Sequence, residues 1–156
     1  MILGLQHIDP QRIAAIDSNR VELRYAEISQ LSQHISSLVP TRSLCFLLVE
    51  NNVGGIAWVM SMIDSRQLVP LILNVKTEDT LYQQLLNTYH PTYICAPNHF
   101  AVKGEIIDSQ YEYTLTKIAN STPALHSELS HLLPTSGSTG SPKLVRHKYD
   151  NIEAAG

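Results

Sequence analysis

The 156-residue sequence has few cysteines, no long apolar run and no basic leader. Its two cysteines, Cys45 and Cys95, are far apart and form no C-x-x-C pair, so we expect buried, inert thiols in a reducing cytoplasm. The longest mostly apolar stretch, residues 53–63, is shorter than the roughly 20 residues that span a membrane. The N-terminus lacks a basic segment before its apolar residues, which argues against a signal peptide.

Charged residues are also scarce, and the net charge argues against partners that need a basic surface. Charged residues make up 16% of the chain, a low fraction that hints at surface covered by more protein. The net charge of −3 leaves no chain-wide basic field, so we expect neither nucleic acid nor an anionic membrane as a partner. Seven histidines are scattered without metal-ligand spacing. The local exception is a basic group near the C-terminus, Lys143, Arg146 and Lys148.

The length favours one domain with a sizeable core. Apolar periodicity and turn residues predict an alternation of strands and helices, which is typical of an α/β fold with a partly parallel sheet and flanking helices. Antiparallel strands are expected on either side of a Gly/Ser-rich loop near the C-terminus. The expected strands are 13–17, 21–25, 44–49, 68–73, 92–96, 111–118, 129–133 and 143–147, and the expected helices are 25–38, 53–63 and 77–89.

Particular residues refine this pattern. Asn51 or Asn52 can cap the second helix, and Gly54 and Gly55 in its first turn permit close approach by a neighbouring segment. Pro70 argues that its strand lies at an edge or carries a bulge.

The chain ends on an incomplete helix signal. Asp150 and Glu153 have the spacing of a capping box, yet only about one helical turn of sequence follows. The pattern is what a truncation inside a larger domain would leave.

The most informative segment is the loop Thr135-Ser-Gly-Ser-Thr-Gly-Ser-Pro-Lys143. Hydroxyls, backbone N–H groups and one ammonium are all hydrogen-bond donors, and the glycines let the backbone approach a ligand closely. Such a set of donors suits a polyanion, above all a nucleotide triphosphate.

Two other kinds of loop share part of this composition. A Walker A loop has a different spacing, because Ser141 and Pro142 separate Gly140 from Lys143 and the following residues look extended rather than helical. An ordinary NTPase is therefore disfavoured. A flexible Ser/Gly/Pro-rich linker is favoured by composition alone but does not explain the order of the residues.

That order closely resembles the phosphate-binding loop of the adenylate-forming (AMP-binding) superfamily, which includes acyl-CoA synthetases, peptide-synthetase adenylation domains and luciferases. Weaker similarities occur in the same order along the chain, at 22–27, at 53–70 and at His147 with Asn151. The resemblance implies an acyl-adenylate-forming fold, of which residues 1–156 would be the N-terminal subdomain, truncated after the loop. It implies that the phosphates of ATP are bound by Thr135, Ser136, Gly137, Ser138, Thr139, Gly140 and Lys143.

The resemblance also implies a two-step ligase. A carboxylic acid would react with ATP, with Mg²⁺ present, to give an acyl-adenylate, and a thiol of CoA or of a carrier protein would then take the acyl group. The remaining catalytic segments, including the Mg²⁺-linked glutamate, would lie in a missing C-terminal part, so the chain alone would be inactive and bind nucleotide weakly. The alternative is a stand-alone nucleotide-binding or interaction module without catalysis.

Overall fold

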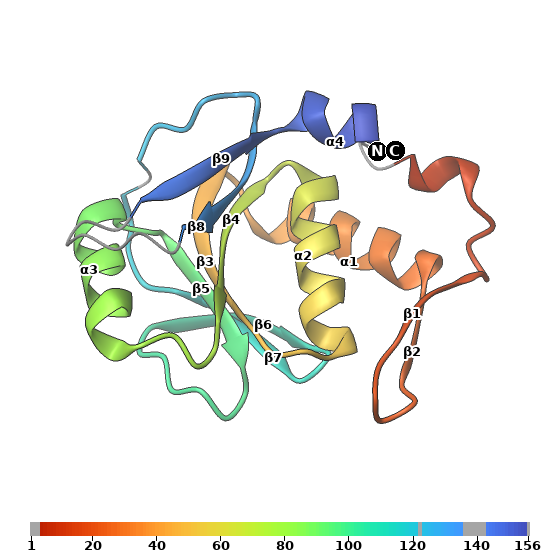
Figure 1. Cartoon of the computed structure of the whole chain (residues 1–156), viewed down its shortest axis with the longest axis horizontal. Coiled ribbons are helices and arrows are strands. Elements are labelled where there is room, and N and C mark those ends of the chain that lie inside the picture. The colour runs from red at the N-terminus through yellow and green to blue at the C-terminus, as the bar shows by residue number, and fades with distance from the viewer. Residues whose placement is uncertain (1–3, 122, 136–142, 156) are drawn as a thin grey trace.

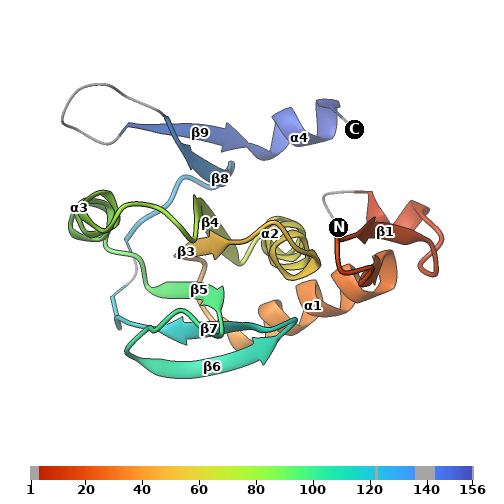
Figure 2. The ribbon, with the colours of Figure 1, turned by 60° about the horizontal axis from the view of Figure 1, so that its bottom comes forward.

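The computed structural model describes residues 4–121, 123–135 and 143–155, and these residues form a sheet covered by helices on both faces (Figure 1). Helices α1 and α2 lie on one face and α3 on the other, as Figure 2 shows from a second direction. The helical elements are η1 (Leu5–His7), α1 (Tyr25–Leu38), α2 (Val53–Ser65), α3 (Asp79–Tyr89) and α4 (Tyr149–Ala155). The strands are β1 (Ile13–Ile16), β2 (Glu22–Arg24), β3 (Ser43–Val49), β4 (Leu68–Asn74), β5 (Tyr93–Pro97), β6 (Glu105–Gln110), β7 (Tyr113–Lys117), β8 (Leu129–Pro134) and β9 (Leu144–Lys148).

The main sheet has seven strands in the order β6-β7-β5-β3-β4-β8-β9. Strand β3 pairs in parallel with β4 and β5, and β4 pairs in parallel with β8. The outer pairings β5–β7, β6–β7 and β8–β9 are antiparallel. The expected partly parallel sheet with antiparallel strands at the C-terminal loop is confirmed.

Each face of the sheet has its own apolar core. Alternate residues of β3 point to opposite faces, so Cys45 packs with α1 and α2 while Phe46 packs with α3. Trp58 of α2 is fully buried, and its indole N–H donates to the carbonyl of Gln110. Both cysteines are free and buried, and burial raises the pKa of each thiol, which makes it unreactive as expected.

The start of α2 is fixed by contacts from distant segments. The Asn52 side chain caps the helix by accepting from the Gly55 N–H at 2.9 Å, so the expected cap is confirmed. The Asp17 carboxylate, from the turn of the β1–β2 hairpin, accepts from the Val53 N–H at 3.2 Å. Gly54 lies directly against Tyr111 and Tyr113, which is the close approach that the sequence predicts.

Two expectations about single residues are wrong. Pro70 lies in an internal strand without a bulge, because β4 is flanked by β3 and β8. Pro70 pairs with Cys45 in the continuous register with β3, and the neighbouring Leu71 pairs with Leu132 of β8. Asp150 is not the N-cap of α4, because the helix begins at Tyr149, which is fully buried against Ile63 of α2.

Candidate functional site

Strands β8 and β9 form a hairpin that holds the two ends of the predicted phosphate loop together. Thr135 donates twice to the carbonyl of Lys143, from its N–H at 2.9 Å and from its hydroxyl at 3.1 Å. Pro134 pairs with Leu144 immediately below this contact. Thr135 and Lys143 are exposed, so the structure brings the ends of the loop together at the surface. The other predicted phosphate-binding residues, Ser136, Gly137, Ser138, Thr139 and Gly140, lie outside the described residues.

The loop leaves the sheet at the edge where parallel α/β proteins bind their ligands. Strand β8 runs parallel to β4, so the loop follows the carboxyl end of a parallel strand. Counting three residues from the Leu71–Leu132 pair places Asn74 level with Thr135, and Asn74 is itself paired with Val49. The ends of β3, β4 and β8 therefore lie in one row, and the helices that follow β3 and β4 lie on opposite faces of the sheet.

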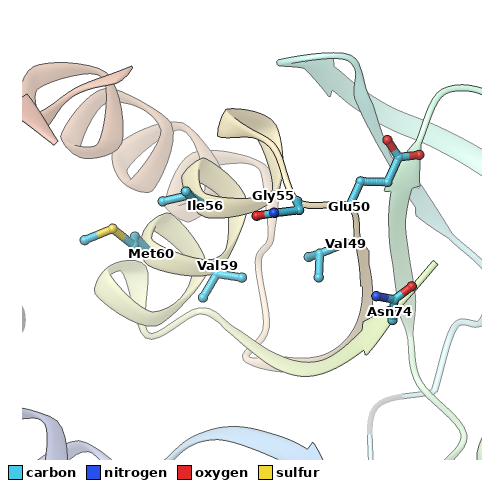
Figure 3. Close-up of a pocket in the computed structure, with 8 residues that line it drawn as sticks. Val49, Glu50, Gly55, Ile56, Val59, Met60 and Asn74 are labelled. Atoms are coloured by element: carbon cyan, nitrogen blue, oxygen red, sulfur yellow. The ribbon is translucent and has the colours of Figure 1, made fainter. Parts of the chain in front are cut away.

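An apolar groove of about 360 Å³ opens at this row, between α2 and the ends of β3 and β4. Figure 3 shows Val49 from the end of β3 facing Ile56, Val59 and Met60 of α2, with Asn74 at the rim. Ile56 is 38% exposed, which is high for a large apolar side chain on a helix that packs on a core. The groove is thus an uncovered apolar surface close to the start of the loop.

A polar network lies beside the groove, after the ends of β3 and β5. The carboxylate of Glu50 turns away from the groove in Figure 3 and contacts the imidazole of His99. The Tyr113 hydroxyl accepts from the Glu50 N–H and donates to the Asn52 side chain, both at 2.9 Å. Burial raises the pKa of Tyr113, so this hydroxyl stays protonated and can donate.

Two histidines stack on the β8–β9 hairpin. The rings of His131 and His147 are parallel, with centroids 4.4 Å apart. The Ser130 hydroxyl lies 2.8 Å from Nδ1 of His131 and donates to the carbonyl of His147 at 3.0 Å. Burial, and next the charge of His147, lower the pKa of His131 to about 4, so His131 is neutral near pH 7. The pair thus packs the two strands of the hairpin against each other.

The described part of the chain contains no cluster of three or more His, Cys, Asp or Glu side chains that could hold a metal ion. Within the same ranges, no helix has the length and hydropathy needed to cross a membrane.

Sequence reasoning missed the residues that surround the groove, among them Glu50, Asn74 and His99. Their positions in the sequence could have indicated them. Each residue lies at, or just after, the carboxyl end of a strand that the sequence predicts as parallel, and such ends meet at one edge of the sheet. The apolar side of the groove had no comparable signal, since Ile56 and Met60 are indistinguishable from core residues in an apolar helix.

Comparison with known proteins rests on structure. No protein-family model matches the chain, and no curated protein does. Many solved structures share its fold. The N-terminal subdomain of NpsA from Klebsiella oxytoca has a TM-score of 0.68 at 17% identity, over 97% of this chain and 42% of that one. MatB from Rhodopseudomonas palustris has a TM-score of 0.69 at 14% identity, over 99% of this chain and 36% of that one.

A third similar structure contains a reaction intermediate. It is o-succinylbenzoate CoA synthetase (MenE) from Bacillus subtilis in complex with an acyl-adenylate, with a TM-score of 0.68 at 17% identity, over 96% of this chain and 42% of that one. The chain thus spans 36–42% of the length of these three structures. In fold, the chain matches the N-terminal subdomain of adenylate-forming enzymes.

Proposed function

We propose that this chain is the N-terminal part of an ATP-dependent, carboxylate-activating ligase, and that residues 135–143 bind the phosphates of ATP. One observation carries the proposal. A loop with the residue order of an adenylate-forming phosphate loop leaves the carboxyl edge of a sheet whose fold is that of adenylate-forming enzymes. The two hydrogen bonds between Thr135 and Lys143 support it, because they bring both ends of the loop together at that edge.

The proposed first step is displacement at the α-phosphate of ATP. A carboxylate oxygen of the acid forms a bond to the α-phosphorus, and the bond from that phosphorus to the oxygen bridging to the β-phosphate breaks, releasing pyrophosphate. Negative charge accumulates on the departing β- and γ-phosphates. Lys143 would supply a positive charge there, and the hydroxyls and backbone N–H groups of the loop would supply hydrogen-bond donors.

In the second step the acyl-adenylate is attacked by the thiol of CoA or of a carrier protein. The carbon–sulfur bond forms, AMP leaves with the pair of electrons of the broken carbon–oxygen bond, and the thiol loses its proton. The intermediate bound to the MenE structure supports an adenylate route for a protein of this fold.

Mg²⁺ would enter this site with ATP. Mg²⁺ is commonly held by nucleotide phosphates and only one or two carboxylates, so the lack of a metal cluster in the described ranges fits a metal carried by the substrate. Bound there, it would neutralise phosphate charge. This chain's own part is to hold the phosphates through the loop and Lys143.

We assign the partly exposed apolar groove along α2 to contact with the downstream part of the same protein, which would complete the active site. Its side chains, Ile56, Val59 and Met60, are apolar and lie beside the carboxyl ends of β3 and β4. Covering such a surface is favourable by about 25 cal/mol per Å² of apolar area.

The test is ATP–pyrophosphate exchange in the longer protein with Lys143→Ala. Losing a positive charge that acts on the leaving pyrophosphate should slow exchange roughly 100-fold. Lys148→Ala is the matched control, because Lys148 is equally exposed, lies on the same hairpin and is outside the loop. An unchanged exchange rate in Lys143→Ala would remove the assigned role.

Measurements on the isolated 156-residue chain distinguish part of a ligase from a stand-alone nucleotide-binding module. We expect it to give no exchange and to bind ATP weakly. Tight, specific ATP binding without exchange would favour a stand-alone binding module, and robust exchange by the chain alone would contradict its assignment as one part of a ligase.

A further inference from the structure

A second cavity lies on the opposite face of the sheet from the groove. It has a volume of about 440 Å³ and is enclosed by the β8–β9 hairpin, the end of α3 and residues 123–126. Leu44, Leu132 and Leu144 form part of its wall, and Leu44 and Leu132 belong to the apolar core under α3. This size and mostly apolar lining are typical of sites for small organic ligands.

The polar groups of this α3-side cavity favour an anion. Arg146, His90 and His126 are among its lining residues, and their side chains can carry positive charge. None of the described lining residues is an aspartate or a glutamate. Arg146 is exposed, and its side chain forms no hydrogen bond or ion pair with any residue that the structure describes. A planar guanidinium pairs with a carboxylate through two parallel hydrogen bonds.

Hydrogen bonds from Arg42 hold part of the cavity wall, residues 126–129, in place. Arg42 donates to the carbonyls of Arg66, His126 and Leu129, at 3.2, 3.0 and 2.5 Å. These hydrogen bonds tie residues 126–129 to the body of the sheet, so the cavity is formed before a ligand arrives. A preformed site avoids much of the ordering cost of binding.

We infer that the α3-side cavity is a binding site for a compact apolar carboxylate, whose carboxylate pairs with Arg146 and whose apolar body lies against the leucines. The inference does not depend on the proposed ATP site. None of the described lining residues belongs to the loop 135–143, and the two sites are tested with different ligands and different variants.

The experiment is a ¹H–¹⁵N NMR titration of the full chain with sodium benzoate at constant ionic strength. Saturable shifts are expected in residues 88–90, 124–126 and 144–146. Arg146→Met keeps the apolar stem and should weaken binding about tenfold or more, because it removes a charge-assisted pair. Lys148→Met removes the same charge from the same strand but does not line the cavity, and it should bind benzoate like the wild type.

A second variant tests the cavity itself. Ala124 is exposed at its rim, so Ala124→Trp should fill the mouth without disturbing the core and abolish the shifts. Inorganic phosphate, charged but without an apolar body, should bind more weakly than benzoate. The inference is overturned if benzoate gives no saturable shifts in the millimolar range, if Arg146→Met binds as the wild type does, or if phosphate binds as well as benzoate.

Discussion

Single residues of the β8–β9 hairpin show how the loop is anchored. Two donors of Thr135 converge on the Lys143 carbonyl, so the residue that begins the loop also closes it. Further along the same hairpin, Leu132 pairs with Arg146. Next to that pair, the ring of His131 stacks on the ring of His147. The hairpin therefore carries polar contacts along its whole length, and the stability of the loop's base depends on them.

The stacked histidines make a pH-dependent contribution to stability. The pKa of His131 is about 4 in the folded chain and 6.5 in the reference state. Below about pH 6.5 the unfolded chain takes up a proton that the folded chain does not, so the contribution is complete above that pH and declines down to about pH 4. When the pH falls from 7 to 5, the unfolding free energy of the wild type should decrease. We predict a smaller decrease for His131→Gln, as measured by urea denaturation at the two pH values.

His147→Gln serves as the companion variant. It removes the second cause of the low pKa of His131 but leaves the burial, so its pH dependence should lie between those of the wild type and His131→Gln. Equal pH dependence in the wild type and His131→Gln would show that the stacked pair has no part in acid sensitivity.

The residue scale also shows how far sequence reasoning reaches into the site. The cap was predictable as Asn51 or Asn52, and Asn52 forms it, because capping acts locally, over three residues. Pro70 was misjudged because the demand for its N–H depends on which strand lies beside β4 and over what length, and both come from distant sequence. Glu50 and His99 are separated by 49 positions, and the sheet order that joins them was not derivable from either segment alone.

Among the elements, α2 has a close contact at its first turn, at Gly54. A Cβ at this position would lie 2.5 Å from the Tyr111 carbonyl oxygen and 2.6 Å from the Tyr113 ring. The hydroxyl of Tyr113 accepts a hydrogen bond from the Glu50 N–H and donates one to the Asn52 side chain, so the ring cannot move aside freely. The N-terminal turn of α2 and the β6–β7 hairpin therefore meet without space for a side chain.

Gly54→Ala should accordingly destabilise the chain. Alanine favours a helix over glycine by about 1 kcal/mol, and overpacking a filled site costs about 1–3 kcal/mol, or more where backbone is the obstacle. We predict a net loss of unfolding free energy in chemical denaturation. Gln84→Ala, on the exposed side of α3, should change it by no more than about 0.5 kcal/mol. If Gly54→Ala is as stable as the wild type, the close approach is not a constraint.

The helices were predicted more accurately than the strands. Helix α1 has the predicted bounds, because its apolar period and the following proline are both local signals. Strand β6 was not predicted at all. Its six residues alternate poorly, Ile106 is 70% exposed, and the strand exists because β7 supplies a partner.

At the scale of the whole molecule, the order of strands and helices led to the correct fold class, while the seven-strand order came only from the structure. The uncovered groove along α2 and the span of 36–42% of similar structures support our proposal that the chain works as one part of a longer ligase. The low fraction of charged residues agrees with a surface that another part covers.

The most direct test of the central claim is an ATP titration of the 156-residue chain followed by ¹H–¹⁵N NMR. The account predicts shifts centred on residues 135–143, reproduced by inorganic pyrophosphate, absent with adenosine, and lost in Lys143→Ala. Shifts centred on other residues, or equal shifts with adenosine, would contradict the claim that this loop binds the phosphates of ATP.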